Sequence, residues 1–314
     1  MLAVRGICGN VLVSDAQVEP THSHLSAPHS AGHLSRSRHD DWSQDSVAIM
    51  RKPLLAIWVL ALALPAGAHD TWVLPVRWNV PVREQLVVDL TSAMDFPTPE
   101  TAARPDRLVD KSIRLNGVVS SLQVSPPRTG AKALQLSARP TAAGLATVWI
   151  ATRPRTLDLK PDEVEHYLRE IGAVDTVGEQ WRRSPDKAWR ETYVKVAKTF
   201  VRVGNAQKDG SWSEAVGASL ELVPATDPTA LSSGHDLAFV VLWNGKPLAG
   251  LAVGAVAGAG ATPALAKTDA QGRVTFRLDR PGPWLFRATL IRPVAGRHGE
   301  WESVFTTVTV HVEP

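Results

Sequence analysis

Residues 236–278 have the sequence DLAFVVLWNGKPLAGLAVGAVAGAGATPALAKTDAQGRVTFRL, in which apolar runs alternate with turn residues. The dipeptide Asn244-Gly245 and the stretch 269–272 predict hairpin turns, because Asn, Asp and Gly tolerate the left-handed backbone that tight turns need. We therefore expect a strand on each side of both turns. The strands predicted for residues 219–314 are 219–223, 236–243, 248–256, 264–268, 273–278, 284–291 and 303–312. Short strands at this spacing predict an immunoglobulin-like β-sandwich.

The preceding residues 69–215 are predicted to form a second β-rich domain. Short apolar runs between residues 72 and 152 are separated by Pro and Gly, which is typical of a sandwich or barrel. The character of the sequence changes near residue 218, so we expect a domain boundary between about residues 205 and 220. The predicted fold class is mainly β, with two helices inserted in the first domain.

The two helices are predicted near 161–171 and 185–203. The first has apolar residues at i, i+3, i+4 and i+7 after a proline, and it ends at Gly172. The second begins with a serine and a proline and places its aromatic residues on one face. Its basic residues are predicted to form a solvated face; they are Lys195, Lys198 and Arg202.

Residues 50–68, MRKPLLAIWVLALALPAGA, have the three parts of a secretory signal peptide. Arg51 and Lys52 form a short basic start, an apolar run follows, and Ala66-Gly67-Ala68 forms a small-residue cleavage site. The apolar run is shorter than the roughly 20 residues that span a bilayer as a helix. We therefore predict export to the periplasm and no stable membrane anchor after cleavage.

Residues 1–49 show no helical or strand period and precede a complete signal peptide. We interpret them as a disordered upstream extension, with Met50 as the true start. They contain the single cysteine of the chain, Cys8. The predicted mature chain therefore lacks thiolate ligands and cysteine nucleophiles, so a metal would have to use nitrogen and oxygen donors.

Composition excludes few classes of function. The formal net charge is +3, from 34 basic and 31 acidic residues, and the basic residues are scattered. No nucleic-acid motif accompanies them, so a nucleic-acid partner is not predicted. The sequence has no phosphate-binding Gly-rich loop, no G-x-S-x-G motif and no HExxH motif, which argues against a hydrolase.

Cleavage after Ala68 would make His69 the first residue, and such a histidine offers a metal both its amine and its imidazole. Two nitrogens of this kind suit nickel, cobalt, copper or zinc. Asp70 is a candidate oxygen donor, and His235 or His298, each in a polar loop, is the candidate third ligand. The alternative is that His69 is incidental to the cleavage site.

Several separate segments together resemble one protein family over essentially all of residues 69–314. They are HDTWVLP (69–75), LKP (159–161) with YLREIG (167–172), RETY (190–193) with AK (197–198), and TDAQGR (268–273) with PGPWL (281–285). The combination resembles a bacterial periplasmic domain-of-unknown-function family labelled as the periplasmic component of cobalt or nickel transport systems. The resemblance implies export, an immunoglobulin-like C-terminal domain and a link to transition-metal uptake.

Relatives often carry a histidine in the strand after Trp284, where this chain has Thr289-Leu290-Ile291. A ligand from that strand is therefore not expected. Three function classes follow: a periplasmic protein that binds nickel, cobalt or copper and assists uptake by an inner-membrane transporter, a metal-free binding or structural module, and a copper oxidase that uses a histidine brace. We predict the first, for which the sequence offers no catalytic residues.

Overall fold

The computed structural model describes residues 69–126, 128–205 and 209–314. The predicted signal peptide and the upstream extension lie outside the described residues. Within the described part of the chain, no helix is long and apolar enough to span a membrane.

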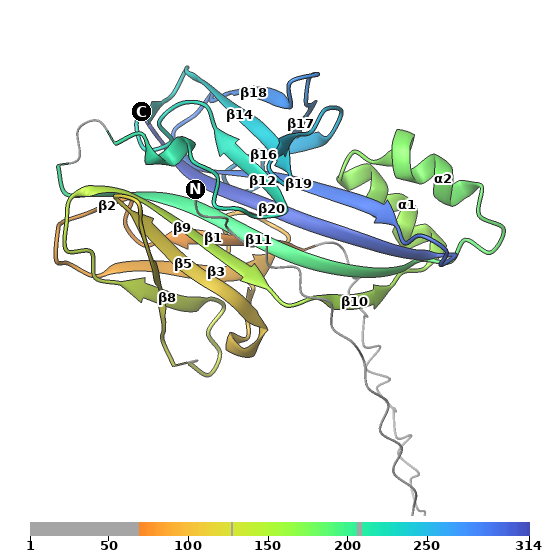
Figure 1. The fold of residues 1–314 in the computed structure, drawn as a ribbon, viewed down its shortest axis with the longest axis horizontal. Coiled ribbons are helices and arrows are strands. Elements are labelled where there is room, and N and C mark those ends of the chain that lie inside the picture. Colours follow the sequence, from red (N-terminus) through yellow and green to blue (C-terminus); the bar gives the residue numbers. More distant parts are fainter. Residues whose placement is uncertain (1–68, 127, 206–208) are drawn as a thin grey trace, which may run out of the picture. The chain divides into compact units, whose positions relative to one another are not determined.

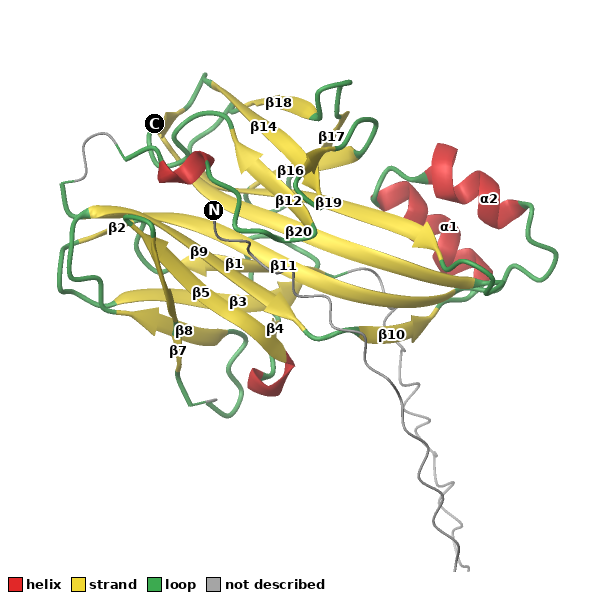
Figure 2. Ribbon diagram, in the orientation of Figure 1, coloured by secondary structure: helices red, strands yellow, loops and turns green. Residues whose placement is uncertain are grey.

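The described fold is mainly β, as predicted; Figure 2 shows strands throughout, with α1 and α2 in one insertion and short helical turns elsewhere. The strands before the insertion are β1 (Asp70–Pro75), β2 (Asn79–Val80), β3 (Leu86–Ala93), β4 (Thr101–Ala102), β5 (Leu108–Leu115), β6 (Val118–Ser121), β7 (Gln123–Val124), β8 (Leu134–Ala138), β9 (Gly144–Thr152) and β10 (Arg155–Asp158). Those after it are β11 (Arg190–Val203), β12 (Leu220–Pro224), β13 (Leu231–Ser232), β14 (Asp236–Trp243), β15 (Lys246–Pro247), β16 (Ala252–Ala257), β17 (Ala264–Lys267), β18 (Arg273–Arg277), β19 (Gly282–Pro293) and β20 (Glu300–Glu313). The helices are η1 (Pro105–Arg107), α1 (Pro161–Glu170), η2 (Val174–Gly178), α2 (Glu179–Arg182) and η3 (Ser211–Ser213).

One large sheet is shared by the two halves of the chain. Its main path has the order β17-β16-β19-β20-β11-β9-β5-β6, and β2, β10 and β13 pair at its sides. The long strands β11 and β20 run parallel and side by side through the middle, with pairs from Arg190↔Glu300 to Thr199↔Thr309 (Figure 1). Because this sheet continues through both sides of the expected boundary at 205–220, it counts against two separate domains.

A smaller sheet packs on each half of the large one. The sheet β1-β3-β8-β7 contributes Val88 and Leu136 to a core that also contains Val148 of β9 and Val201 of β11. The sheet formed by β12, β14, β15 and β18 packs instead against β16, β19 and β20. The protein is therefore two sandwiches built on a common sheet, and the second occupies the residues predicted to be immunoglobulin-like.

One of the two hairpin turns predicted for the second sandwich is confirmed, at Asn244-Gly245. Residues 269–272 form a turn as expected, but it joins β17 to β18, which lie in different sheets, so it is not a hairpin. Asn244 and Gly245 both have positive φ angles, 48° and 76°, and they connect β14 to β15. Gly272 also has a positive φ, 71°, and a Cβ there would lie 2.9 Å from two backbone atoms. This turn therefore requires glycine.

The helix predicted near 185–203 is wrong, because residues 190–203 form the central strand β11. Six successive residues of this strand, 196–201, are buried. A strand covered on both faces loses the alternation of apolar and polar residues, so its aromatic residues fit a helical period by coincidence. The strand contains many β-branched and aromatic residues, a composition that favours β structure.

The basic residues predicted to lie on the solvated face of that helix are therefore also in different surroundings from those predicted. Lys198 is 2% exposed and lies inside the protein. Lys195 lines a cavity, and Arg202 pairs with Asp227 at 3.1 Å. The first helix is correct, since α1 begins at Pro161 and buries Val164, Tyr167 and Leu168.

The helical insertion covers one end of the large sheet. Side chains of α1 and α2 share an apolar cluster with residues of β19 and β20, including Ile291 and Phe305. Trp189 stacks on Trp301, with ring centroids 4.6 Å apart. The insertion thereby places Tyr167 of α1 beside strands β11 and β20.

Candidate functional site

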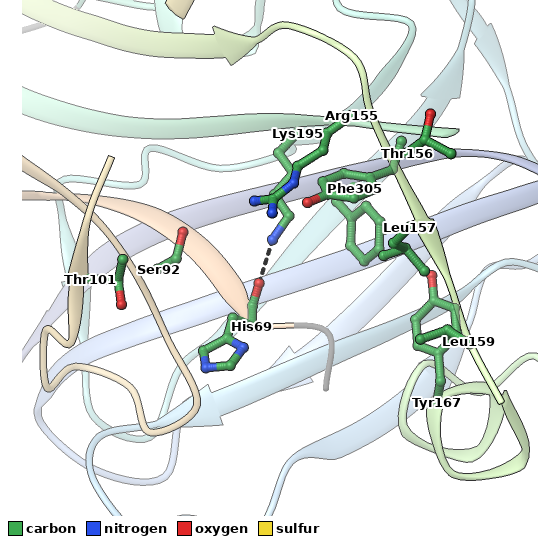
Figure 3. A pocket seen from close by; sticks show the side chains of 11 residues that line it. His69, Ser92, Thr101, Arg155, Thr156, Leu157, Leu159, Tyr167, Lys195 and Phe305 are labelled. Atoms are coloured by element: carbon green, nitrogen blue, oxygen red, sulfur yellow. Dashed lines mark hydrogen bonds between the residues drawn. The ribbon is translucent and has the colours of Figure 1, made fainter. Parts of the chain in front are cut away.

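A cavity of about 350 Å³, here called the His69 cavity, lies where the first small sheet, strand β10, helix α1 and the large sheet meet (Figure 3). Its lining comes from segments far apart in the sequence. The lining residues are His69, Ser92, Thr101, Arg155, Thr156, Leu157, Leu159, Tyr167, Tyr193, Lys195 and Phe305.

His69 immediately precedes β1 and lines the cavity. Its ring Nε2 lies 3.8 Å from Oε2 of Glu100, and the two side chains are 34% and 39% exposed. Its backbone carbonyl accepts a hydrogen bond of 2.5 Å from Nζ of Lys195, drawn as the dashed line in Figure 3. The backbone of His69 is thus held by the large sheet while its ring faces a carboxylate.

Strand β1 is also hydrogen-bonded to side chains of β20. The hydroxyl of Thr307 donates to the carbonyl of Thr71 at 2.7 Å, and the hydroxyl of Thr309 donates to the carbonyl of Val73 at 2.6 Å. These side chains of β20 fix the backbone of β1 and therefore the position of His69.

Lys195 is held in a largely desolvated position. Burial lowers its pKa from 10.5 to about 8, although the charges of Asp70 and Glu191 act in the opposite direction. The positive charges of Arg155 and Arg107 lower it further. At neutral pH the ammonium group is still mostly protonated.

Asp70 does not face the cavity as a metal ligand would. Its carboxylate accepts a hydrogen bond from Arg287, which also contacts Glu170 at 3.2 Å. Burial raises the pKa of Asp70, and the Arg287 guanidinium opposes that rise. The predicted oxygen donor is therefore occupied by an ion pair that ties β1 to β19 and α1.

A second buried carboxylate, that of Glu191, lies beside the aromatic residues of the cavity. It accepts hydrogen bonds from Tyr167 at 3.0 Å, from Trp189 at 2.9 Å and from Ser303. Burial raises the pKa of Glu191, and burial together with this carboxylate raises the pKa of Tyr167 well above its ordinary value. The network fixes the aromatic ring of Tyr167 against the cavity.

The other predicted ligands lie elsewhere. His298 is exposed; its Nε2 lies 2.9 Å from Oγ of Ser184, and its Nδ1 lies 3.4 Å from Asp186. His235 is exposed in the turn before β14. Over the described ranges, no group of three or more His, Cys, Asp or Glu side chains is arranged to hold a metal. The structure therefore does not bring His235 or His298 to His69.

The sequence predicted His69 as a site residue, and the structure places it in the lining of a cavity whose other residues were not predicted. Lys195 and Tyr193 were placed on a helix, whereas they lie on β11. Arg155 and Glu100 had no motif around them, because a cavity formed by distant segments leaves no local spacing pattern. The β-branched composition of residues 190–203 is the signal that could have placed Lys195 on a strand.

A family model described as "Domain of unknown function (DUF4198)" matches residues 66–292. The chain belongs to this family. No curated protein matches it. The DUF4198 match covers the strands of the first sandwich, most strands of the second and all residues that line the His69 cavity except Phe305 of β20.

Two solved structures are distantly similar to this chain. The Yersinia pseudotuberculosis adhesin InvE is 12% identical with a TM-score of 0.19, and the three N-terminal domains of the bacteriophage RB49 Highly Immunogenic Outer Capsid protein (Hoc) are 9% identical with a TM-score of 0.17. Each alignment covers 76% of this chain and 58% of the other.

Proposed function

We propose that this DUF4198 protein is exported to the periplasm and binds a divalent transition metal, nickel, cobalt or copper, at a processed N-terminal His69. The proposal includes delivery of that metal to an inner-membrane uptake transporter. The observation that supports it best is the position of His69 at a cavity, with its carbonyl held by Lys195 and its Nε2 beside Glu100.

The chemistry of the donors fits such a metal. A carboxylate beside Nε2 favours the tautomer that carries its proton on Nε2, which leaves the lone pair of Nδ1 for a metal. Cleavage after Ala68 would add the α-amine of the same residue. An amine and an imidazole are nitrogen donors that nickel, cobalt and copper accept.

The roles of the chain's own residues follow from this arrangement. His69 would hold the ion, Glu100 would orient the ring, and Lys195 would fix the backbone from which both nitrogens project. Glu100 lies 3.8 Å from Nε2, so it would act on the ring through its charge; partners of metal-binding histidines typically change metal affinity about 10- to 100-fold when they are removed.

Among the residues that line the cavity, His69 is the one histidine. The described residues therefore give no support to the histidine-brace oxidase, which needs a second histidine. The metal-free binding module is supported by the cavity itself, and a ligand of that kind is considered below.

The test combines intact-mass measurement of the exported protein with calorimetric titration of nickel, cobalt and copper. We expect a mass that starts at His69, and we expect binding to weaken at least 100-fold in a form extended by one N-terminal glycine and in His69→Ala. Glu100→Gln should weaken binding about 10- to 100-fold. His298→Ala, which alters an exposed histidine at another place, is the matched control and should stay within about twofold. Equal binding by the extended form would contradict the proposal.

A further inference from the structure

The His69 cavity has two chemically different walls. Ser92 and Thr101 form a polar wall beside His69, whereas Leu157, Phe305 and neighbouring aromatic residues form an apolar wall (Figure 3). Lys195 and Arg155 lie between the two, with their charged groups near one another in the view of Figure 3. The cavity therefore combines apolar surface with positive charge.

The positive groups have few partners of their own. Arg155 is exposed and makes no side-chain hydrogen bond or ion pair with any described residue. Lys195 donates one hydrogen bond, to the carbonyl of His69, and its Nζ lies 5.6 and 5.3 Å from the ring centroids of Tyr193 and Phe305; an ammonium group has three N–H donors. Both groups can therefore accept an anion as an additional partner.

The two carboxylates whose charges act most strongly on Lys195, those of Asp70 and Glu191, already have other hydrogen-bond partners. Asp70 is paired with Arg287, and Glu191 accepts hydrogen bonds from Tyr167, Trp189 and Ser303. Neither carboxylate forms a hydrogen bond with the Lys195 ammonium in the described part of the chain. An anion that enters the cavity does not have to displace an existing salt bridge.

The apolar wall is a set of packed aromatic rings. Tyr193 meets Phe305 edge to face, with centroids 5.8 Å apart, and Tyr167 lies nearly parallel to Phe305 at 6.3 Å. Such rings bury apolar ligand surface and offer edge or face contacts to another ring. A volume of about 350 Å³ lies in the range of small-molecule sites.

We propose that the His69 cavity binds a small organic carboxylate with an aromatic or branched apolar body, whose carboxylate pairs with Lys195 and Arg155 and whose body packs on Tyr193 and Phe305. An inorganic anion would leave the apolar wall in contact with water. A neutral apolar compound would desolvate Lys195 without giving it a partner, which is unfavourable for a charge. The proposal goes beyond metal binding and does not require it.

The probe is benzoate, titrated calorimetrically into the purified protein in low-chloride buffer with EDTA at pH 7. Benzamide, which has the same ring without the charge, and acetate, which has the charge without the ring, are the matched control ligands. We expect benzoate to bind at least tenfold more tightly than either. Binding of benzamide or acetate as tight as that of benzoate would overturn the proposal, and so would an absence of benzoate binding at millimolar concentration.

Variants test the location of the carboxylate. Arg155→Gln, at an exposed position whose loss should not affect folding, should weaken benzoate binding about fivefold. Lys195→Gln should weaken it tenfold or more, because a hydrogen bond between charged groups away from solvent is stronger. Arg273→Gln alters an exposed arginine on β18 outside the cavity and should have no effect.

Unchanged benzoate affinity in Arg155→Gln and Lys195→Gln would overturn the assignment. If Lys195→Gln fails to fold, Arg155→Gln and the benzamide comparison still decide the question. The His69→Ala variant separates the two proposals, since it should lose metal binding and keep benzoate binding within about threefold.

Discussion

Lys195 and Lys198 lie three residues apart on β11 and therefore point to opposite faces of the large sheet. Lys198 is 2% exposed, and its Nζ lies 2.7 Å from Oε1 of an equally buried Glu221. That carboxylate also accepts hydrogen bonds from the backbone N–H groups of Val216 and Gly217, at 2.8 and 3.2 Å. Lys195 instead borders a cavity and donates to one backbone carbonyl.

The difference separates a structural ion pair from a binding group. Lys198 pairs with Glu221, whose carboxylate oxygens also accept backbone hydrogen bonds. A buried ion pair compensates its desolvation cost only when its remaining hydrogen-bonding groups are satisfied in this way. Burial lowers the pKa of both lysines, but only Lys195 is left with N–H donors facing an open volume. Lys195 is proposed as a ligand-binding group because only some of its N–H donors have a partner and because it borders a cavity; burial alone, which Lys198 shares, would not be enough.

The largest expected effect comes from breaking the buried ion pair of Lys198 and Glu221. Glu221→Leu leaves the Lys198 ammonium buried without its carboxylate, and the free energy of unfolding should fall by about 3–5 kcal/mol. Urea unfolding followed by tryptophan fluorescence measures this. The double variant with Lys198→Met removes both charges and should recover most of the loss.

The control for that experiment is the exposed pair of Arg77 and Glu84, whose side chains are about half exposed. Glu84→Leu should change the free energy of unfolding by less than about 1 kcal/mol. A loss below 1 kcal/mol in Glu221→Leu would mean that the pair does not contribute as a buried ion pair should.

The next effect concerns pH and Lys195. Its pKa is about 8 in the folded chain and near 10.5 in the unfolded chain. Below pH 8 both states are protonated, so the full penalty of burying the charge is present. Between pH 8 and 10.5 the unfolded chain binds more protons, so stability due to this residue rises with pH, by at most about 3 kcal/mol.

The measurement compares wild type with Lys195→Gln. The variant lacks this titration, while Lys198 is present in both proteins and its contribution cancels. The difference in unfolding free energy should therefore move in favour of wild type as pH rises from 8 to 10. A difference that stays constant with pH would place Lys195 in a solvated position.

The sequence predicted the second sandwich well because its strands alternate and its turns use local chemistry. β14 spans Asp236–Trp243, the predicted range, and Asn244-Gly245 forms its turn. The shared sheet was not predicted, because the pairing of β11 with β20 joins residues about a hundred positions apart. No local pattern records such a pairing.

The site followed the same division. His69 was predicted from the cleavage pattern, which is local, whereas its position in the cavity lining follows only from the fold. Lys195 was misplaced because β11 is buried on both faces, so its period could not distinguish strand from helix. His235 and His298 were chosen by residue type alone, and residue type does not specify where a loop lies.

The smallest expected effect tests how β1, and with it His69, is held on the large sheet. Thr309 is fully buried, and its hydroxyl donates to the carbonyl of Val73. Thr309→Val keeps the shape but leaves that carbonyl without this donor, so the free energy of unfolding should fall by about 1 kcal/mol. Thr275→Val, at an exposed position on β18, is the control and should change it by less than about 0.5 kcal/mol.

Thr307→Val carries the comparison to the cavity end of the same strand. Its hydroxyl donates to the carbonyl of Thr71, two residues from His69, so we expect a similar loss of stability. Because this contact positions the backbone that Lys195 also holds, metal binding should weaken about threefold in Thr307→Val and remain unchanged in Thr309→Val. Equal metal affinities in the two variants would show that the position of His69 depends on Lys195 and not on β20. Lys195 and Lys198 would then differ only in the groups that they contact.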